Sequence, residues 1–338
     1  MTRDRSGSQP RVHDPSVAAA ATAPAPAPDW AVAIVASRED ARTLQATLES
    51  VLDASDARVT TIDLLVNGNA GLVREVAQHL AGGRLTPGRR ERIRLWSIDF
   101  GDKANAWNQY VHRVWAGSRL VFFVDGYCRV DRKAFEALAN GLERKPECLA
   151  ATGVPSTGRS AGRLRRQMQS EGGIHGNLHV LRGEVLAKMR SLGFKLPVGL
   201  YRTDALVGAA LSFNLDPGRF DWDSRRILLV DDARWSLRHL SLWRPADLKA
   251  HAMRRLRQEQ GRLENLAVRR QLAELRRPVG SLAPTARGLV EEWLAESGYR
   301  PGNSLFERWL FRTAHSRLLA WQAPPPERLS ARQVETSN

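Results

Sequence analysis

The chain has 338 residues, of which 43% are hydrophobic and 26% are charged. These proportions are typical of a globular protein and exclude a wholly disordered chain, a collagen-like repeat and a small disulfide-stabilised scaffold. Lys and Arg number 51 and Asp and Glu number 36, which gives a formal net charge of +15 at pH 7. Such a surplus favours a polyanionic partner, namely a nucleotide, a nucleic acid or an anionic lipid surface, without choosing among them.

The two cysteines, Cys128 and Cys148, are too few to cross-link a chain of this length, so we expect thiols of a reducing compartment. No apolar stretch approaches the roughly 20 residues that a membrane-spanning helix needs. An Ala-rich run near the N-terminus is interrupted by prolines. We therefore expect residues 1–29 to form a flexible tail.

From Trp30 onward, β-branched apolar runs alternate with segments of helical periodicity. Strands are predicted at 30–36, 61–66, 93–98 and 120–124, and helices at 41–54, 72–81 and 103–116. Short connections between alternating elements predict a mainly parallel sheet flanked by helices, with a ligand crevice at the carboxyl ends of the strands. The polar residues that follow these strands should then gather at one edge of the sheet: Ser37, Asn67, Asp99 and Asp125. The chain contains neither a dinucleotide-binding glycine fingerprint nor a P-loop.

An ordered series of short motifs runs from about residue 30 to residue 265. Its members are Ala36–Asp40, Val66–Asn69, Gly101–Asn108, Asp125–Tyr127, Gly176–Leu186 and Leu196–Leu206. In this order the motifs resemble those of family 2 glycosyltransferases, which have the GT-A fold and use nucleotide-sugar donors. Three acidic positions of that family differ here, because Val66, Tyr127 and Thr203 occupy them. These replacements favour an alternative in which the chain is a catalytically weakened relative that binds or scaffolds a partner.

The resemblance implies roles for individual residues. It assigns donor binding to Arg38, Glu39, Asn67, Lys103, Asn108, Asp125 and Asn177. It makes Asp204 the general base of an inverting transfer, and Asp125 the ligand of a divalent cation, Mn²⁺ or Mg²⁺. Structural roles stay open for each of them: Asp125 as a turn or capping residue, Asp204 as a helix N-cap and Lys103 as a solvated surface charge.

The C-terminal third has a different composition. Residues 247–277 are predicted to form a long helix in which Arg alternates with apolar residues. Such a helix either packs on the core with a solvated face or is attracted to a diphosphate or an anionic membrane. A second helix is predicted at 285–296, and a capping box from Ser304 to Glu307 predicts a third. The expected organisation is a GT-A-like domain at 30–246, a basic helical region at 247–323 and a loose tail at 324–338.

The sequence therefore predicts an enzyme, a hexosyltransferase-like glycosyltransferase. It would move a sugar from a nucleotide-sugar donor to a saccharide or lipid-linked hydroxyl acceptor, in cell-surface polysaccharide or glycolipid synthesis. The expected location is the cytoplasm, with peripheral contact to an anionic membrane as an additional feature. No nucleic-acid partner is expected, because zinc-finger spacing and an RNA-recognition motif are absent from the sequence.

Overall fold

The computed structural model describes residues 29–55, 58–83, 85–156, 161–237, 245–299, 301 and 304–336, with side chains described for all of these except 245–255. The tail predicted at 1–29 lies outside this range apart from Asp29. Within the described residues, no helix is both long enough and apolar enough to cross a bilayer. Cys128 and Cys148 are both buried free thiols.

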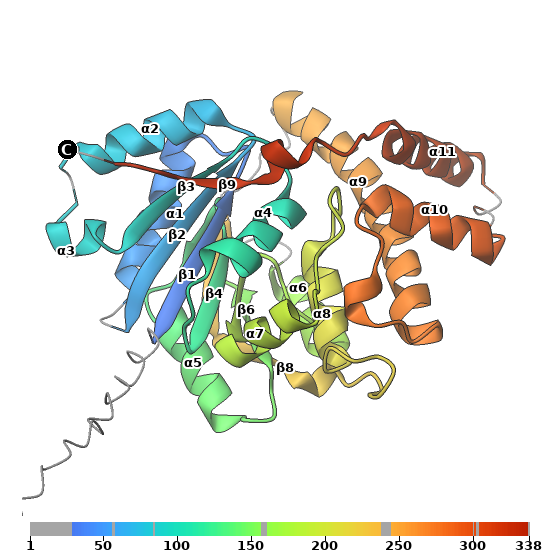
Figure 1. Cartoon of the computed structure of the whole chain (residues 1–338), viewed down its shortest axis with the longest axis horizontal. Helices are drawn as coiled ribbons and strands as arrows, with labels where there is room; N and C mark the ends of the chain where they lie inside the picture. The colour runs from blue at the N-terminus through green and yellow to red at the C-terminus, as the bar shows by residue number, and fades with distance from the viewer. Residues whose placement is uncertain are drawn as a thin grey trace, which may run out of the picture.

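The described part of the chain forms one nine-stranded sheet, in the order β5-β8-β6-β7-β4-β1-β2-β3-β9 (Figure 1). Its strands are β1 Trp30–Ala36, β2 Val59–Asn67, β3 Ile93–Ile98, β4 Leu120–Asp125, β5 Cys128–Val130, β6 Ala150–Pro155, β7 Leu178–Arg182, β8 Ile227–Leu237 and β9 Ala331–Val334. The four strands that were predicted are β1 to β4, and they are parallel to one another: β1 pairs with β2 and β4, and β2 pairs with β3.

The sheet as a whole is mixed: β1, β2, β3, β4, β6 and β8 share one direction, as expected of a mainly parallel sheet, and β5, β7 and β9 run the other way. β7 runs antiparallel to both β4 and β6, β5 runs antiparallel to β8, and β9 runs antiparallel to β3. The pairing of β7 with β4 brings the loop before β7 beside the end of β4, where Asp125 N–H donates to Asn177 O at 3.3 Å. The mixed topology thus adds a second wall beside the strand ends.

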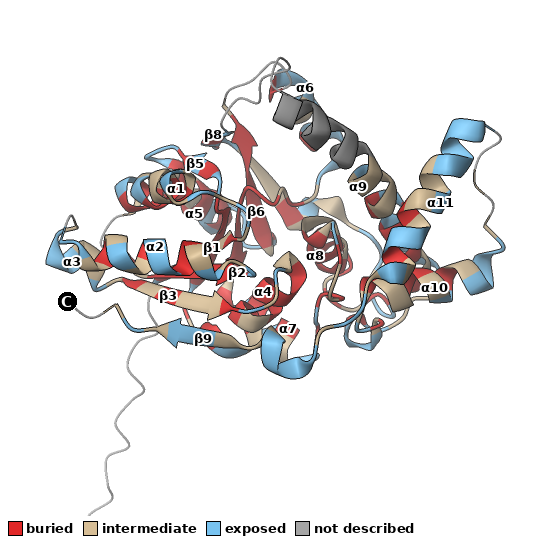
Figure 2. Ribbon diagram, turned by 90° about the horizontal axis from the view of Figure 1, so that it is seen from above, coloured by how far each residue is buried: buried red, intermediate tan, exposed pale blue. Residues whose placement is uncertain are grey.

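Helices flank both faces of the sheet, and α10 and α11 stand to its side against α9, as Figures 1 and 2 show. The α-helices of the described residues are α1 Ala41–Ala54, α2 Ala70–Ala81, α3 Pro87–Arg90, α4 Lys103–Gln109, α5 Ala134–Arg144, α6 Ala161–Glu171, α7 Gly183–Ser191, α8 Thr203–Ser212, α9 Pro245–Arg269, α10 Ala286–Ser297 and α11 Leu305–Ala320. Alternate residues of β1 enter two different cores, as the period of two in a strand requires. Val32 and Ile34 pack with Leu48 of α1, whereas Ala33 packs with Trp107 of α4 and Leu206 of α8.

Side-chain caps fix where several helices begin. Asp40 accepts the Thr43 N–H at the start of α1, and Asp102 accepts the Asn105 N–H at 2.6 Å at the start of α4. The predicted capping box is confirmed in part, because Ser304 accepts the N–H of Glu307 at 3.1 Å. The helix predicted at 103–116 is shorter, since α4 ends at Gln109 and continues as one wide turn over Tyr110–Val114.

The end of the chain belongs to the sheet. Residues 324–338 were expected to be loose, but β9 pairs with β3, and Phe100 N–H donates to Arg328 O at 3.0 Å. The Arg332 guanidinium also forms an ion pair with Asp99 at 2.5 Å. The long basic helix likewise differs from its prediction at 247–277, because α9 ends at Arg269 and a wide turn follows over Arg270–Glu274.

Candidate active site

The carboxyl ends of β1, β2 and β4 meet at one edge of the sheet, as the sequence predicted. In the register of the sheet, Val35 lies beside Asp125. Asn67, the last residue of β2, donates from its side chain to Ala36 O at 2.7 Å. Gly126 N–H in turn donates to Val35 O at 2.8 Å. These bonds hold the three strand ends together.

A small pocket opens at this edge. Its apolar wall includes Val35, Trp107, Phe123 and Val207. The charged and imidazole side chains that line it belong to Lys103, Asp125, His179 and Asp204. Lys103 and Asp125, two predicted site residues on different elements, therefore face the same space as Asp204, the predicted base.

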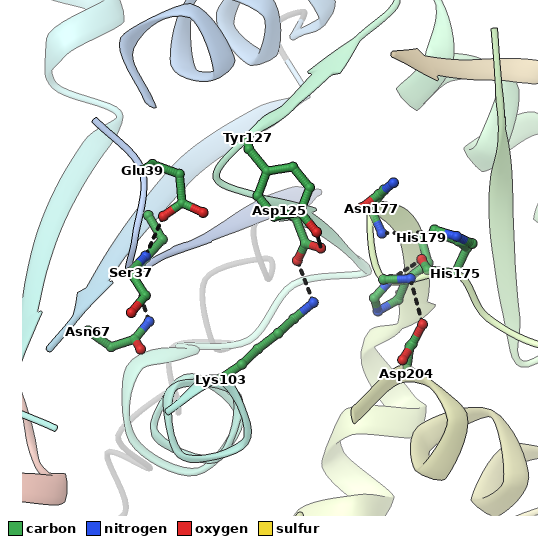
Figure 3. A network of polar contacts seen from close by, with 12 residues as sticks. Ser37, Glu39, Asn67, Lys103, Asp125, Tyr127, His175, Asn177, His179 and Asp204 are labelled. Carbon is green, nitrogen blue, oxygen red and sulfur yellow. Dashed lines mark hydrogen bonds and ion pairs between the residues drawn. The ribbon is translucent and has the colours of Figure 1, made fainter. Parts of the chain in front are cut away.

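Asp125 has partners on both of its oxygens (Figure 3). Lys103 Nζ lies 2.5 Å from Oδ1, and the Tyr127 phenol donates to Oδ2 at 3.0 Å. The Asp125 side chain is 7% exposed, whereas that of Lys103 is 40% exposed, so the pair sits at the pocket mouth and not in the dry core. Burial lowers the pKa of Lys103, but the carboxylates of Asp125 and Asp204 outweigh it, so the pKa is raised. The charge of Asp125, followed by burial, raises the pKa of the Tyr127 phenol well above its ordinary value.

Asp204 lies in the first turn of α8, on the opposite wall. Its Oδ2 accepts the Gly176 N–H at 3.1 Å, which orients the carboxylate. A β-carbon built on Gly176 would lie 3.5 Å from Asp204 Oδ2, 3.6 Å from Asp125 Oδ2 and 3.0 Å from Lys103 Nζ. An atom at this position beside Gly176 would therefore contact the carboxylates of Asp125 and Asp204 and the ammonium group of Lys103.

The loop before β7 supplies His175 and Asn177 near this point, and β7 itself supplies His179, as Figure 3 shows. His179 shares a hydrogen bond of 3.1 Å between Nδ1 and His175 O, and its ring stacks on Phe123. Burial lowers the pKa of His179 to about 3 and also lowers that of His175, so both imidazoles are neutral at pH 7. Asn177 is buried, and its backbone carbonyl holds Asp125 N–H.

The other side of the edge carries polar groups at the ends of β1 and β2. Glu39 accepts Ser37 N–H at 2.5 Å, and Arg38 beside it is exposed. Asn67 is 1% exposed, and none of the residues that the structure describes donates a hydrogen bond to its buried side-chain oxygen. An acceptor of this kind costs free energy unless a donor reaches it.

Two residues from the predicted motifs have other tasks. Asn108 does not reach the pocket, because its amide exchanges two hydrogen bonds of 2.8 Å with the backbone of Leu196. Asp102 caps α4 and also accepts Gly199 N–H at 2.9 Å, and burial raises its pKa. Both side chains fix the loop that precedes α8.

Glu264 of α9 is a residue that sequence reasoning missed. It is 1% exposed and accepts the N–H groups of Tyr201 at 3.0 Å and Arg202 at 3.2 Å, immediately before α8. Burial raises its pKa to about 7. It lies some sixty residues after the loop that it holds, within a helix of many charges, so no local pattern distinguishes it. His179 was also missed as a pocket residue.

The side chains at the strand ends do not fit the divalent cation expected at Asp125. Among the described residues, no group of three or more His, Cys, Asp or Glu could hold a metal ion. Mg²⁺ and Mn²⁺ take oxygen ligands, and Mg²⁺ in phosphate-binding sites is held by one or two free carboxylates together with the substrate phosphates. Asp125 offers one carboxylate, already bonded to Lys103 and Tyr127.

Comparison with known proteins bears on the fold. No protein-family model and no curated protein sequence matches the chain. A matching solved structure is the mannosyltransferase PcManGT from Pyrobaculum calidifontis, in complex with GDP-Man and Mn²⁺. The two are 17% identical, the match covers 86% of this chain and 74% of that one, and the TM-score is 0.52. At this identity the likeness concerns the fold: this chain has an α/β fold similar to that of a glycosyltransferase.

Proposed function

We propose that the protein is a glycosyltransferase that uses a nucleotide-sugar donor. The observation that carries the proposal is the placement of Asp125 with Lys103 on one wall and Asp204 on the other, all facing Gly176. Transfer of a sugar needs positive charge beside the leaving diphosphate and a base beside the acceptor hydroxyl. The similar fold of a mannosyltransferase that binds GDP-Man supports the same function.

In the proposed reaction, the nucleoside lies at the ends of β1 and β2, beside Arg38, Glu39 and Asn67. Lys103 faces the diphosphate. The Asp204 carboxylate accepts the proton of the acceptor hydroxyl as that oxygen bonds to the anomeric carbon. The bond from that carbon to the phosphate oxygen breaks, and a nucleoside diphosphate leaves. A single displacement of this kind inverts the anomeric centre.

The finer predictions from the sequence belong to this proposal. They are the GT-A fold, membership of family 2, hexosyl transfer to a saccharide or lipid-linked acceptor, a cytoplasmic location and contact with an anionic membrane. The proposed boundaries, 30–246 and 247–323, stay predictions. The divalent cation predicted from the resemblance takes no part in the steps above, because the donor set around Asp125 does not fit it.

The test is release of nucleoside diphosphate from a panel of nucleotide sugars, comparing wild type with Asp204→Asn. The amide oxygen of Asn retains the bond to Gly176 N–H, so the fold should persist. Loss of the base should lower kcat about 100- to 10,000-fold. Asp232→Asn, at an exposed position, is the matched control. Full activity of Asp204→Asn would contradict the assignment of the base.

A weakened, non-catalytic relative is the second candidate, because Asp125 is occupied on both oxygens by neighbouring side chains. Calorimetry with GDP-mannose and UDP-glucose, with and without Mn²⁺, separates the two. No heat of binding under any condition would favour a binding or scaffold protein.

A further inference from the structure

We infer that this protein binds its sugar-nucleotide diphosphate without a divalent cation, because the Lys103 ammonium occupies the carboxylate position that a metal ion would need. The inference rests on the proposed function and deepens it by naming the charge that meets the diphosphate. Its basis is the arrangement around Asp125, argued in three steps.

The first step is the fixed position of Lys103. It is the first residue of α4, directly after Asp102, whose carboxylate accepts N–H groups from Asn105 and Gly199. With the helix start held in this way, the side chain extends into the pocket and reaches Asp125 Oδ1 at 2.5 Å. The contact is too short to leave room for a cation between the two atoms.

The second step concerns Tyr127, two residues after Asp125. The resemblance places a second carboxylate there, and that carboxylate would complete a metal site. In this chain a neutral phenol stands there instead and donates to Asp125 Oδ2 at 3.0 Å. Both oxygens of the Asp125 carboxylate are therefore bonded to neighbouring donors, and the Lys103 ammonium, which has no acceptor, offers a cation no ligand of its own.

The third step is the remaining capacity of the ammonium. Lys103 Nζ has three N–H donors, of which one points to Asp125, and it lies 3.0 Å from the position of a β-carbon on Gly176. The other donors are available to a phosphate oxygen entering between the pocket walls. One side chain thus bridges the carboxylate and the diphosphate, which is the task of the metal ion in a two-carboxylate site.

The experiment measures binding of GDP and UDP by calorimetry in EDTA and in Mn²⁺, together with free Mn²⁺ by electron paramagnetic resonance. Wild type should bind one nucleotide with a Kd that differs by less than about twofold between the two conditions, and should not deplete free Mn²⁺. Lys103→Met should weaken binding in EDTA by about 10- to 100-fold, since hydrogen bonds to a charged group contribute about 1.5–3 kcal/mol. Lys103→Arg should retain part of the affinity, and the exposed Lys133→Met is the matched control.

Tyr127→Asp is the gain-of-function counterpart of Lys103→Met, because it places a second carboxylate at a position where the residue is 43% exposed. It should acquire measurable Mn²⁺ binding and make nucleotide binding depend on Mn²⁺. The inference is overturned if wild type binds nucleotide only with Mn²⁺, if Lys103→Met binds normally in EDTA, or if Tyr127→Asp gains no Mn²⁺. Binding that needs Mn²⁺ overturns this inference alone, whereas absence of all nucleotide binding overturns the proposed function as well. Thermal unfolding of each variant verifies that it is folded.

Discussion

Gly176→Ala tests whether the two walls of the pocket act on one substrate. The added methyl group would lie 3.0 Å from Lys103 Nζ, the flexible end of a side chain that can shift by a few tenths of an ångström. Its distances of 3.5 Å to Asp204 and 3.6 Å to Asp125 are ordinary contacts. Gly176 is not among the glycines with positive φ, so alanine fits its backbone without strain.

The free energy of unfolding should therefore change by less than about 1 kcal/mol. Activity should respond much more, because the methyl group occupies the space where the anomeric carbon and the acceptor oxygen must meet. A displacement of about 1 Å in reacting groups costs roughly 100-fold. We expect kcat/KM for nucleoside diphosphate release to fall at least about 100-fold.

The assay combines that activity with urea unfolding of the same preparations. The control is Gly88→Ala, where an added β-carbon meets no atom within 4 Å and which lies in α3. Normal transfer by Gly176→Ala would show that the reaction does not take place between Asp125 and Asp204. A large loss of stability would show that the space around Gly176 is smaller than the geometry indicates.

Three further changes have defined outcomes. Burial lowers the pKa of His179 to about 3, so its neutral form contributes stability above the unfolded pKa of about 6.5. That stability is lost as the pH falls toward 3. When urea unfolding is measured at pH 7.5 and at pH 5.0, wild type should lose about 2 kcal/mol more than His179→Gln between the two. Burial raises the pKa of Glu264 to about 7, so its pH effect on stability is opposite to that of His179: the neutral carboxyl favours the fold at low pH, and that advantage is lost as the pH rises through 7. A Glu264→Gln variant should lack this pH-dependent change in the free energy of unfolding. The same pH dependence in the variant as in wild type would contradict the prediction. Asp63 is fully buried and accepts two hydrogen bonds from the Arg94 guanidinium. Asp63→Ala should therefore lower the free energy of unfolding in urea by about 3 kcal/mol, whereas Asp53→Ala, at an exposed ion pair with Arg89, should lower it by less than about 1 kcal/mol. Equal losses in the two variants would refute the prediction.

Much of the fold could be predicted where local pattern and tertiary structure agree. β1 and β4 are apolar runs, and α1 and α2 carry apolar residues at helical spacing on the face that they bury. The strands after β4 depend on partners far away in the sequence. β9, for example, is only Ala331–Val334, with two exposed residues in the middle, and becomes a strand because β3 offers it an edge.

The site divides in the same way. Asp125 ends a buried strand, Lys103 begins α4 and Asp204 lies in the first turn of α8, so their positions could be predicted from the ends of elements. Asn108 lies in the same motif as Lys103, but both polar groups of its amide are hydrogen-bonded to the backbone of Leu196. No local sequence pattern predicts the path of the loop that contains Leu196. Glu264 was missed for the same reason, because its partners are backbone groups of another segment.

The pairing of β3 with β9 joins residues near position 95 to residues near position 333. During synthesis, the growing polypeptide would expose the edge of β3 until more than 230 further residues had left the ribosome. Unpaired strand edges recruit other chains, and contacts between remote segments form slowly. Protein quality control would therefore meet a nascent chain in which the edge of β3 stays uncovered until β9 has been synthesised.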